Sequence, residues 1–248
     1  MLKGAIFDLD GTLFDSMFIW DTAGEVYLRS IGIEPREDLQ KVLKPMSLLQ
    51  SATYIREKYA IPLTVEGIMG GINRTVEDFY FHTVQPKEGV ITLLEQMKAQ
   101  GIEMCIATAT DRYQVEAALK RCGMESFFSE IFTCTDVGHG KDEPIIFQKA
   151  MEHLGTTRAN TVVFEDAYHA AKTAKADGFI TVAVYDSHET KQAELLSISD
   201  CFIENFTQTE HFWKFAYGLY PQASSGRLGA PPYAAIQNDA ERRKEQNP

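Results

Sequence analysis

The chain has 248 residues, of which 44% are hydrophobic and 24% charged, a composition typical of a globular protein with a buried core. Its formal net charge of −11 argues against a nucleic-acid partner, because nothing would offset the repulsion of nucleic-acid phosphates at long range. Four cysteines without a CxxC pair, and no apolar stretch of the ~20 residues that span a bilayer, predict a cytoplasmic protein without a membrane partner.

Short unbroken apolar runs predict strands that are buried on both faces of a parallel sheet. These runs cover residues 4–8, 104–107, 161–164 and 181–184. Helical patterns follow over residues 113–121, 145–154 and 170–176, and each ends at a glycine, the usual left-handed stop. This alternation predicts an α/β fold with a Rossmann-like, doubly wound parallel sheet.

One long segment breaks the alternation. Helical patterns there follow one another without a strand between them, over residues 18–30, 37–43, 48–59 and 64–82. We therefore predict an all-α cap domain over residues 16–83, with hinges near Asp15 and Gln85-Pro86. Residues 1–15 and 84–220 then form the α/β core domain, and residues 221–248, which lack an apolar period, form a flexible C-terminal tail.

The first candidate site residues are Asp8 and Asp10, at the end of the first predicted strand. Residues at i and i+2 on an extended chain share a face, so one carboxylate can attack while the other handles protons. Gly11 lets the chain turn sharply and bring backbone N–H groups close to an anion. Taken alone, this motif is more often a solvated turn.

Thr108 closes the second predicted strand, where its hydroxyl and the following N–H of Ala109 can donate to a phosphoryl oxygen. The alternative is a helix N-cap, for which Thr110 or Asp111 is better placed. Lys141 lies in a loop just before a helix, where a lone lysine is ordinarily a solvated charge.

Glu165 and Asp166 leave the third predicted strand together. Because strand C-termini form the ligand crevice of such sheets, two acids there would repel each other unless a cation joins them. With Asp8 and Asp10 they place carboxylates along one edge of the sheet. Hard oxygen ligands without a His or Cys cluster indicate Mg²⁺ rather than zinc.

This ordered set of residues resembles the four motifs of the haloacid dehalogenase superfamily, and the match spans nearly all of residues 1–215. The helical insert is placed as in the β-phosphoglucomutase and phosphoglycolate phosphatase branch. The resemblance implies a Mg²⁺-dependent phosphatase that hydrolyses a small phosphorylated metabolite through an aspartyl-phosphate. The chain departs from the family pattern at Ala167 and Ala170, which puts only local loop geometry in doubt. Ile145 stands where the family usually has an acid, although Asp142 and Glu143 lie nearby.

The resemblance also implies a role for each motif residue. Asp8 would be the nucleophile and a Mg²⁺ ligand, and Asp10 the general acid/base that also gives its backbone carbonyl to the metal. The phosphoryl group would be bound by Thr108, Ala109 and Lys141. The metal site would be completed by Glu165 and Asp166.

Two alternative functions stay open, a phosphosugar mutase and a catalytically idle phosphate-binding module. The intact motif set argues against the idle module. β-Phosphoglucomutases carry a proton-relaying His where this chain has Trp20, and a Trp side chain has only an N–H donor. Thr12 points the same way, because mutases of this type tend to have Val there. We therefore favour hydrolysis.

The remaining expectations concern the cap. Arg74, in the last cap helix, is expected to contact the substrate. Phe14, Phe18 and Tyr80 are expected to form cap core, whereas Trp20 faces the active site. We expect a monomer or weak dimer, and the sequence does not specify the substrate.

Overall fold

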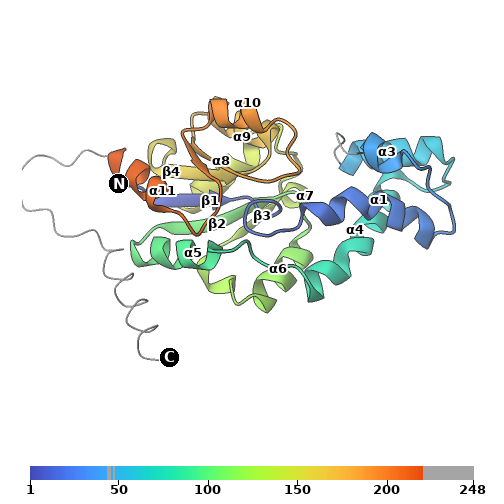
Figure 1. The fold of residues 1–248 in the computed structure, drawn as a ribbon, viewed down its shortest axis with the longest axis horizontal. Helices are drawn as coiled ribbons and strands as arrows, with labels where there is room; N and C mark the ends of the chain where they lie inside the picture. Colours follow the sequence, from blue (N-terminus) through green and yellow to red (C-terminus); the bar gives the residue numbers. More distant parts are fainter. Residues whose placement is uncertain (44–45, 47, 220–248) are drawn as a thin grey trace, which may run out of the picture.

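The structure is a computed structural model that describes residues 1–43, 46 and 48–219. The described strands form one six-stranded parallel sheet in the order β3-β2-β1-β4-β5-β6 (Figure 1). Their bounds are Gly4–Phe7 for β1, Glu103–Thr108 for β2, Ile131–Thr133 for β3, Thr161–Glu165 for β4, Ile180–Val184 for β5 and Cys201–Ile203 for β6. The central position of β1 confirms the predicted Rossmann-like, doubly wound sheet.

The central strands are apolar throughout because both of their faces are buried. Phe7 on β1 and Phe164 on β4 are neighbours in register, and their rings stack with centroids 4.4 Å apart. Ile6 and Val163, one residue earlier on each strand, belong to the apolar cluster of the opposite face. Burying one such Phe contributes roughly 1.5–3 kcal/mol, so the alternation pins the strand register and with it the residues that follow.

Helices cover both faces of the sheet (Figure 1). One face packs against α5 (Val90–Ala99), α6 (Arg112–Arg121) and α11 (Glu210–Gly218). The other packs against α8 (Ile145–His153) and α9 (Tyr168–Ala176), and α10 (Gln192–Ile198) contacts α9. The one-turn helix α7 (Cys134–Val137) and the 3₁₀ turns Glu125–Phe127 and Arg158–Asn160 complete this part of the chain.

The predicted run of helices is present as α1 (Met17–Ser30), α2 (Leu39–Leu43), α3 (Leu48–Lys58) and α4 (Val65–His82). We call residues 16–83 the helical insert; it lies beyond one end of the sheet (Figure 1). Its helices α1 and α4 approach closely, because a Cβ at Gly71 would lie 2.2 Å from the ring of Tyr27. Phe14 is buried as predicted, but Phe18 is 47% exposed, so the prediction of cap core was wrong for that residue.

The chain enters and leaves the helical insert at neighbouring points. The Asp15 N–H donates to the Gln85 carbonyl at 3.1 Å, and the Lys87 N–H donates to the Leu13 carbonyl at 2.8 Å. The two positions expected to act as hinges are therefore hydrogen-bonded to each other. The domain boundaries themselves, and any hinge motion, stay predictions.

The sequence reading missed several elements, namely the edge strands β3 and β6 and the helices α5, α7, α10 and α11. The expected C-terminal tail, residues 221–248, lies outside the described residues. Among the residues that the structure describes, no helix has both the length and the apolar character needed to cross a bilayer.

Candidate active site

Three carboxylates meet where the central strands end. Asp8 follows β1, its N–H donating to the Phe164 carbonyl at 3.0 Å, while Glu165 ends β4 and Asp166 comes next. One carboxylate oxygen from each lies within 4.8 Å of the others, and the three side chains are buried. The parallel pairing of β1 with β4 brings these acids together from opposite ends of the sequence.

Lys141 supplies a positive charge to this cluster. Its Nζ bonds to Asp8 Oδ1 and lies 2.5 Å from Glu165 Oε1, and the side chain is buried. Burial alone would lower the pKa of Lys141, but the carboxylates of Asp8 and Glu165 outweigh it and raise the pKa. The lysine is therefore a firmly protonated ammonium, not the solvated charge that a loop lysine usually is.

The positive charge of Lys141 does not balance the cluster. Burial, followed by the charges of Asp8 and Glu165, raises the pKa of Asp166 well above its usual range. Its one hydrogen-bond donor among the described side chains is Thr12, whose Oγ1 lies 2.9 Å from Asp166 Oδ1. Buried carboxylates with excess negative charge and oxygen-only ligands fit a hard divalent cation such as Mg²⁺.

Gly11 is required by this geometry. Its φ is +78°, in the left-handed region, and a Cβ placed on it would lie 2.3 Å from Asp166 Oδ2. Any side chain would therefore push Asp166 out of the carboxylate cluster. The sharp turn expected from the sequence brings the loop after β1 directly against the acid that follows β4.

Asp10 is surrounded by hydroxyl groups. Ser16 Oγ and Tyr80 Oη donate to its Oδ1 at 2.7 and 2.5 Å, and Thr110 Oγ1 donates to its Oδ2 at 2.5 Å. Burial, followed by the charge of Asp8, raises the pKa of Asp10, and the three hydroxyl groups only partly offset this. A carboxyl group with a raised pKa, two residues from Asp8, is suited to proton transfer.

Sequence reasoning missed these three donors. Tyr80 is fully buried, as expected for cap core, but its hydroxyl reaches from α4 to Asp10 on the core. Nothing in the sequence marks that contact, which spans 70 residues of chain. For Thr110 the sequence contained a weak indication of a place near the site, because it follows Thr108 by two residues at the same strand end.

The predicted phosphate-binding residues Thr108, the last residue of β2, and Ala109, which follows it, lie at the same edge of the sheet. Thr108 is buried, and its Oγ1 accepts the Thr110 N–H at 3.1 Å, which leaves the hydroxyl proton free to be donated elsewhere. Ala109 is exposed. Asp111 takes the N-cap position of α6 without a cap bond from its side chain, and instead accepts from Asn73 of α4 at 2.7 Å.

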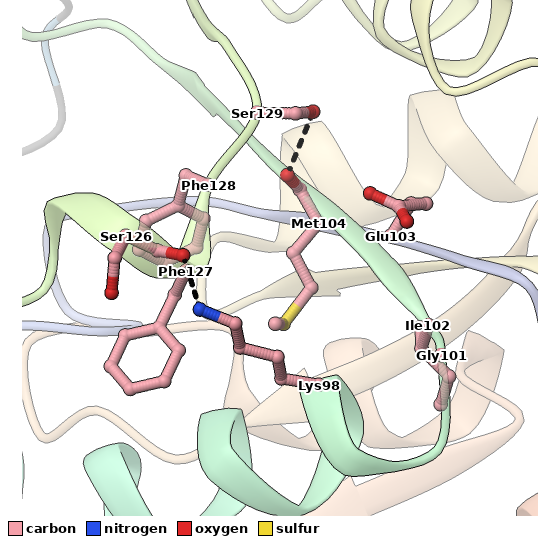
Figure 2. Close-up of a pocket in the computed structure, with 9 residues that line it drawn as sticks. All are labelled: Lys98, Gly101, Ile102, Glu103, Met104, Ser126, Phe127, Phe128 and Ser129. Atoms are coloured by element: carbon pink, nitrogen blue, oxygen red, sulfur yellow. Dashed lines mark hydrogen bonds between the residues drawn. The ribbon is translucent and has the colours of Figure 1, made fainter.

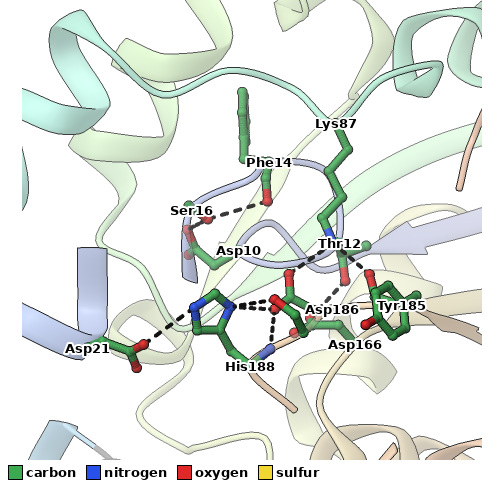
Figure 3. A network of polar contacts seen from close by, with 11 residues as sticks. Asp10, Thr12, Phe14, Ser16, Asp21, Lys87, Asp166, Tyr185, Asp186 and His188 are labelled. Atoms are coloured by element: carbon green, nitrogen blue, oxygen red, sulfur yellow. Dashed lines mark hydrogen bonds and ion pairs between the residues drawn. The ribbon is translucent and has the colours of Figure 1, made fainter. Parts of the chain in front are cut away.

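A polar network joins the loop after β5 to Lys87, which follows the helical insert, and to helix α1 of the insert (Figure 3). Asp186, after β5, accepts from Lys87 Nζ at 3.0 Å and from the His188 N–H at 2.9 Å. His188 Nε2 lies 3.3 Å from Asp21 Oδ2 on α1. These contacts hold α1 close to the loops beside the carboxylate cluster.

Neither the predicted substrate contact Arg74 nor a small surface pocket belongs to the carboxylate cluster. Arg74 is exposed on α4, and its contact with substrate stays a prediction. A small surface pocket lies where β2 begins, at the edge of the sheet opposite the carboxylates (Figure 2). Its one lysine, Lys98, donates to the Ser126 carbonyl at 2.8 Å and lies over the Phe127 ring, so the positive charge of this lysine already has partners.

Metal binding to the cluster can be tested through stability. Mg²⁺ at about a hundred times its dissociation constant should stabilise the wild-type fold by ~2.7 kcal/mol. Asp166→Asn should lose most of that gain, yet unfold at a higher temperature than wild type in EDTA, because one repelling buried charge is gone. Calorimetry of both proteins with and without Mg²⁺ checks this, with the exposed Asp142→Asn as the control. An undiminished Mg²⁺ effect in Asp166→Asn would exclude this residue as a ligand.

The chain belongs to the haloacid dehalogenase-like hydrolase family, whose sequence model matches residues 5–184. The fold, the order of the acids along the chain and their meeting at one sheet edge agree with this assignment. The resemblance and the enzyme class inferred from the sequence, a hydrolase of this family, are thereby confirmed.

Curated relatives carry phosphatase names. The chain is 25% identical over 177 residues to the phosphorylated carbohydrates phosphatase of Thermotoga maritima, covering 71% of this chain and 82% of the relative. It is 27% identical over 216 residues to the validoxylamine A 7′-phosphate phosphatase of Streptomyces hygroscopicus subsp. limoneus, with coverages of 84% and 96%. The pyrophosphatase PpaX of Bacillus cereus is 28% identical over 185 residues, with coverages of 74% and 83%.

Solved structures share the fold. CbbY from Rhodobacter sphaeroides, in complex with phosphate, superposes with a TM-score of 0.74 at 20% identity, covering 85% of this chain and 97% of that one. A putative β-phosphoglucomutase from Thermotoga maritima gives a TM-score of 0.68 at 22% identity, with coverages of 88% and 98%. At these identities the likeness concerns the fold alone.

Proposed function

We propose that the chain is a Mg²⁺-dependent phosphatase that hydrolyses a small phosphorylated metabolite through an aspartyl-phosphate on Asp8. The observation that carries this proposal is the position of Asp8. Its carboxylate is buried beside one lysine and two further acids, and a carboxyl group with a raised pKa lies two residues away. The phosphatase names of the curated relatives support the same reaction class.

In the first half-reaction, the Asp8 carboxylate attacks phosphorus and the bond from phosphorus to the leaving oxygen breaks. Asp10, protonated, gives its proton to that oxygen. Lys141 offsets the negative charge of Asp8 before attack and donates to a phosphoryl oxygen, together with Thr108 and the Ala109 N–H. In the second half-reaction, Asp10 takes a proton from water as the water attacks phosphorus, and the Asp8 carboxylate leaves.

The carboxylates of Asp8, Glu165 and Asp166, with the backbone carbonyl of Asp10, would hold Mg²⁺. When bound, the ion supplies positive charge that offsets the negative charge of the phosphoryl group and of the surrounding acids. We further propose a small phosphate ester as the substrate, as the sequence predicts. A cytoplasmic location also stays a prediction.

The direct test is turnover of para-nitrophenyl phosphate by the purified protein. We expect phosphate release with Mg²⁺ and none in excess EDTA, with activity restored when Mg²⁺ is added back. Equal turnover in both buffers would overturn the metal requirement. No turnover of this ester or of a panel of phosphorylated metabolites would favour the idle phosphate-binding module.

The mutase alternative has its own test. We supply β-glucose 1-phosphate with a trace of the 1,6-bisphosphate and follow glucose 6-phosphate and free phosphate. Because Trp20 can donate but cannot accept a proton, it cannot perform the relay of a mutase histidine, and we expect free phosphate as the main product. Formation of glucose 6-phosphate that outpaces phosphate release by an order of magnitude would establish the mutase.

A further inference from the structure

Two aromatic residues of the helical insert form a hydrogen-bond chain that ends on Asp10. Trp20, half-buried on α1, donates its Nε1–H to the Tyr80 hydroxyl oxygen at 2.9 Å. Tyr80, fully buried on α4, donates its own proton to Asp10 Oδ1 at 2.5 Å. The chain therefore runs from one helix of the insert through another to the candidate acid/base of the core.

The direction of this chain is fixed by its first member. The indole nitrogen of Trp20 can only donate, so the Tyr80 oxygen is the acceptor of that bond. The Tyr80 hydroxyl in turn donates its own proton to Asp10 Oδ1. A histidine in place of Trp20 could donate or accept, and would leave the direction open.

The consequence is a difference between the two oxygens of Asp10. A carboxylate oxygen accepts about two hydrogen bonds. Among the described residues, Oδ1 accepts from Ser16 and Tyr80, whereas Oδ2 accepts from Thr110 alone. The remaining site, and so the proton that Asp10 delivers, belongs to Oδ2.

We propose that Tyr80 and Trp20 are positioning residues that fix the rotation of the Asp10 carboxyl group so that Oδ2 carries the proton delivered to the leaving group. This rests on the proposed function, in which Asp10 protonates the leaving oxygen. It adds a link from the helical insert to the chemistry, because Asp10 is correctly oriented only while α1 and α4 lie against the core.

A purely structural role is the competing explanation. Any buried tyrosine hydroxyl needs a partner, and Tyr80 could be using Asp10 only as the nearest acceptor. Loss of that bond would then weaken the fold or slow all substrates equally. An effect on proton delivery would instead be larger for a leaving group that must be protonated in order to depart.

The experiment compares phenyl phosphate with para-nitrophenyl phosphate. The two esters are similar in shape, but phenolate leaves poorly without a proton and nitrophenolate leaves well. We expect Tyr80→Phe to lower kcat/KM for phenyl phosphate by ~10-fold more than for para-nitrophenyl phosphate, below the ~10²–10⁴-fold of a lost general acid. Asp10→Asn should show the same selectivity to a larger degree.

A double-mutant cycle tests the hydrogen-bond chain from Trp20 through Tyr80 to Asp10. Trp20→Phe should show the selectivity more weakly, and should add nothing in the Tyr80→Phe background, because Trp20 acts only through Tyr80. If Tyr80→Phe does not fold, Trp20→Phe at its half-buried position carries the test alone. Additive effects of the two substitutions would show that Trp20 does not act through Tyr80.

Tyr113→Phe is the matched control. The Tyr113 hydroxyl, on α6, donates to Glu77 of α4 at 2.6 Å, so this bond also joins a tyrosine to a carboxylate between the core and the insert. We expect no change in leaving-group selectivity. The same selectivity in Tyr113→Phe would mean that loosened docking, not orientation of Asp10, is the cause.

The outcomes separate this inference from the proposed function. Selectivity in Asp10→Asn but not in Tyr80→Phe overturns the positioning role and leaves the acid role intact. Absence of selectivity in Asp10→Asn overturns the acid role itself, and the positioning role with it.

Discussion

Asp8→Asn is expected to lower phosphatase turnover on the order of 10³-fold or more while the protein remains folded, because an amide cannot form the covalent intermediate. Stability should not fall. The substitution removes one of three buried carboxylates that repel one another, and Lys141 keeps Glu165 as its partner at 2.5 Å. Turnover of para-nitrophenyl phosphate and the thermal midpoint in EDTA, measured on the same sample, check both expectations.

Chemical trapping makes the assignment of Asp8 specific. Acid quenching of the wild-type enzyme during turnover should leave one phosphoryl group on the peptide that contains Asp8, and none in Asp8→Asn. The exposed Asp142→Asn serves as the control and should be labelled like wild type. Full activity in purified Asp8→Asn would falsify the nucleophile assignment.

Lys141→Met should have the largest effect on stability. The methionine keeps most of the side-chain volume, but it leaves Asp8 and Glu165 without their shared cation in a buried site. Removing one partner of a buried ion pair typically costs ~3–5 kcal/mol. We expect a loss of this size in EDTA and a smaller one in Mg²⁺, because a bound cation relieves part of the repulsion. Activity in Mg²⁺ should be lost.

Urea unfolding in the two buffers measures this effect, with Lys149→Met as the control at an exposed position on α8. A loss of stability that is the same in EDTA and in Mg²⁺ would contradict the expectation. It would mean that the lysine and the metal do not share the charge of one site.

The sequence predicted the centre of the sheet well and its edges poorly. β1, β2, β4 and β5 are buried on both faces, so their unbroken apolar runs are distinctive. The edge strands β3 and β6 have only three residues each, too few for any periodic signal. Helix α5 begins with Val90-Ile91-Thr92, a β-branched run that resembles a strand start more than a helix.

The same contrast applies to the site. Asp8, Glu165 and Asp166 could be placed together from sequence, because parallel strands bring their C-terminal ends to one edge. The surroundings of Asp10 could not, because they depend on how the helical insert lies on the core. Tyr80 carries no local signal of its hydroxyl contact, since a buried tyrosine on a helix is ordinarily part of the apolar packing.

The hydrogen bonding between the segments that lead into and out of the helical insert has an evolutionary consequence. Because Asp15 is hydrogen-bonded to Gln85, the ends of the long excursion between them are held together whatever its length. Each doubling of such a loop costs only ~0.6 kcal/mol of closure entropy. The helices between these points can therefore be lengthened, shortened or exchanged in descendants without shifting β1 against β2. The carboxylates of Asp8, Glu165 and Asp166 lie outside these helices, so they can be retained while the helices change.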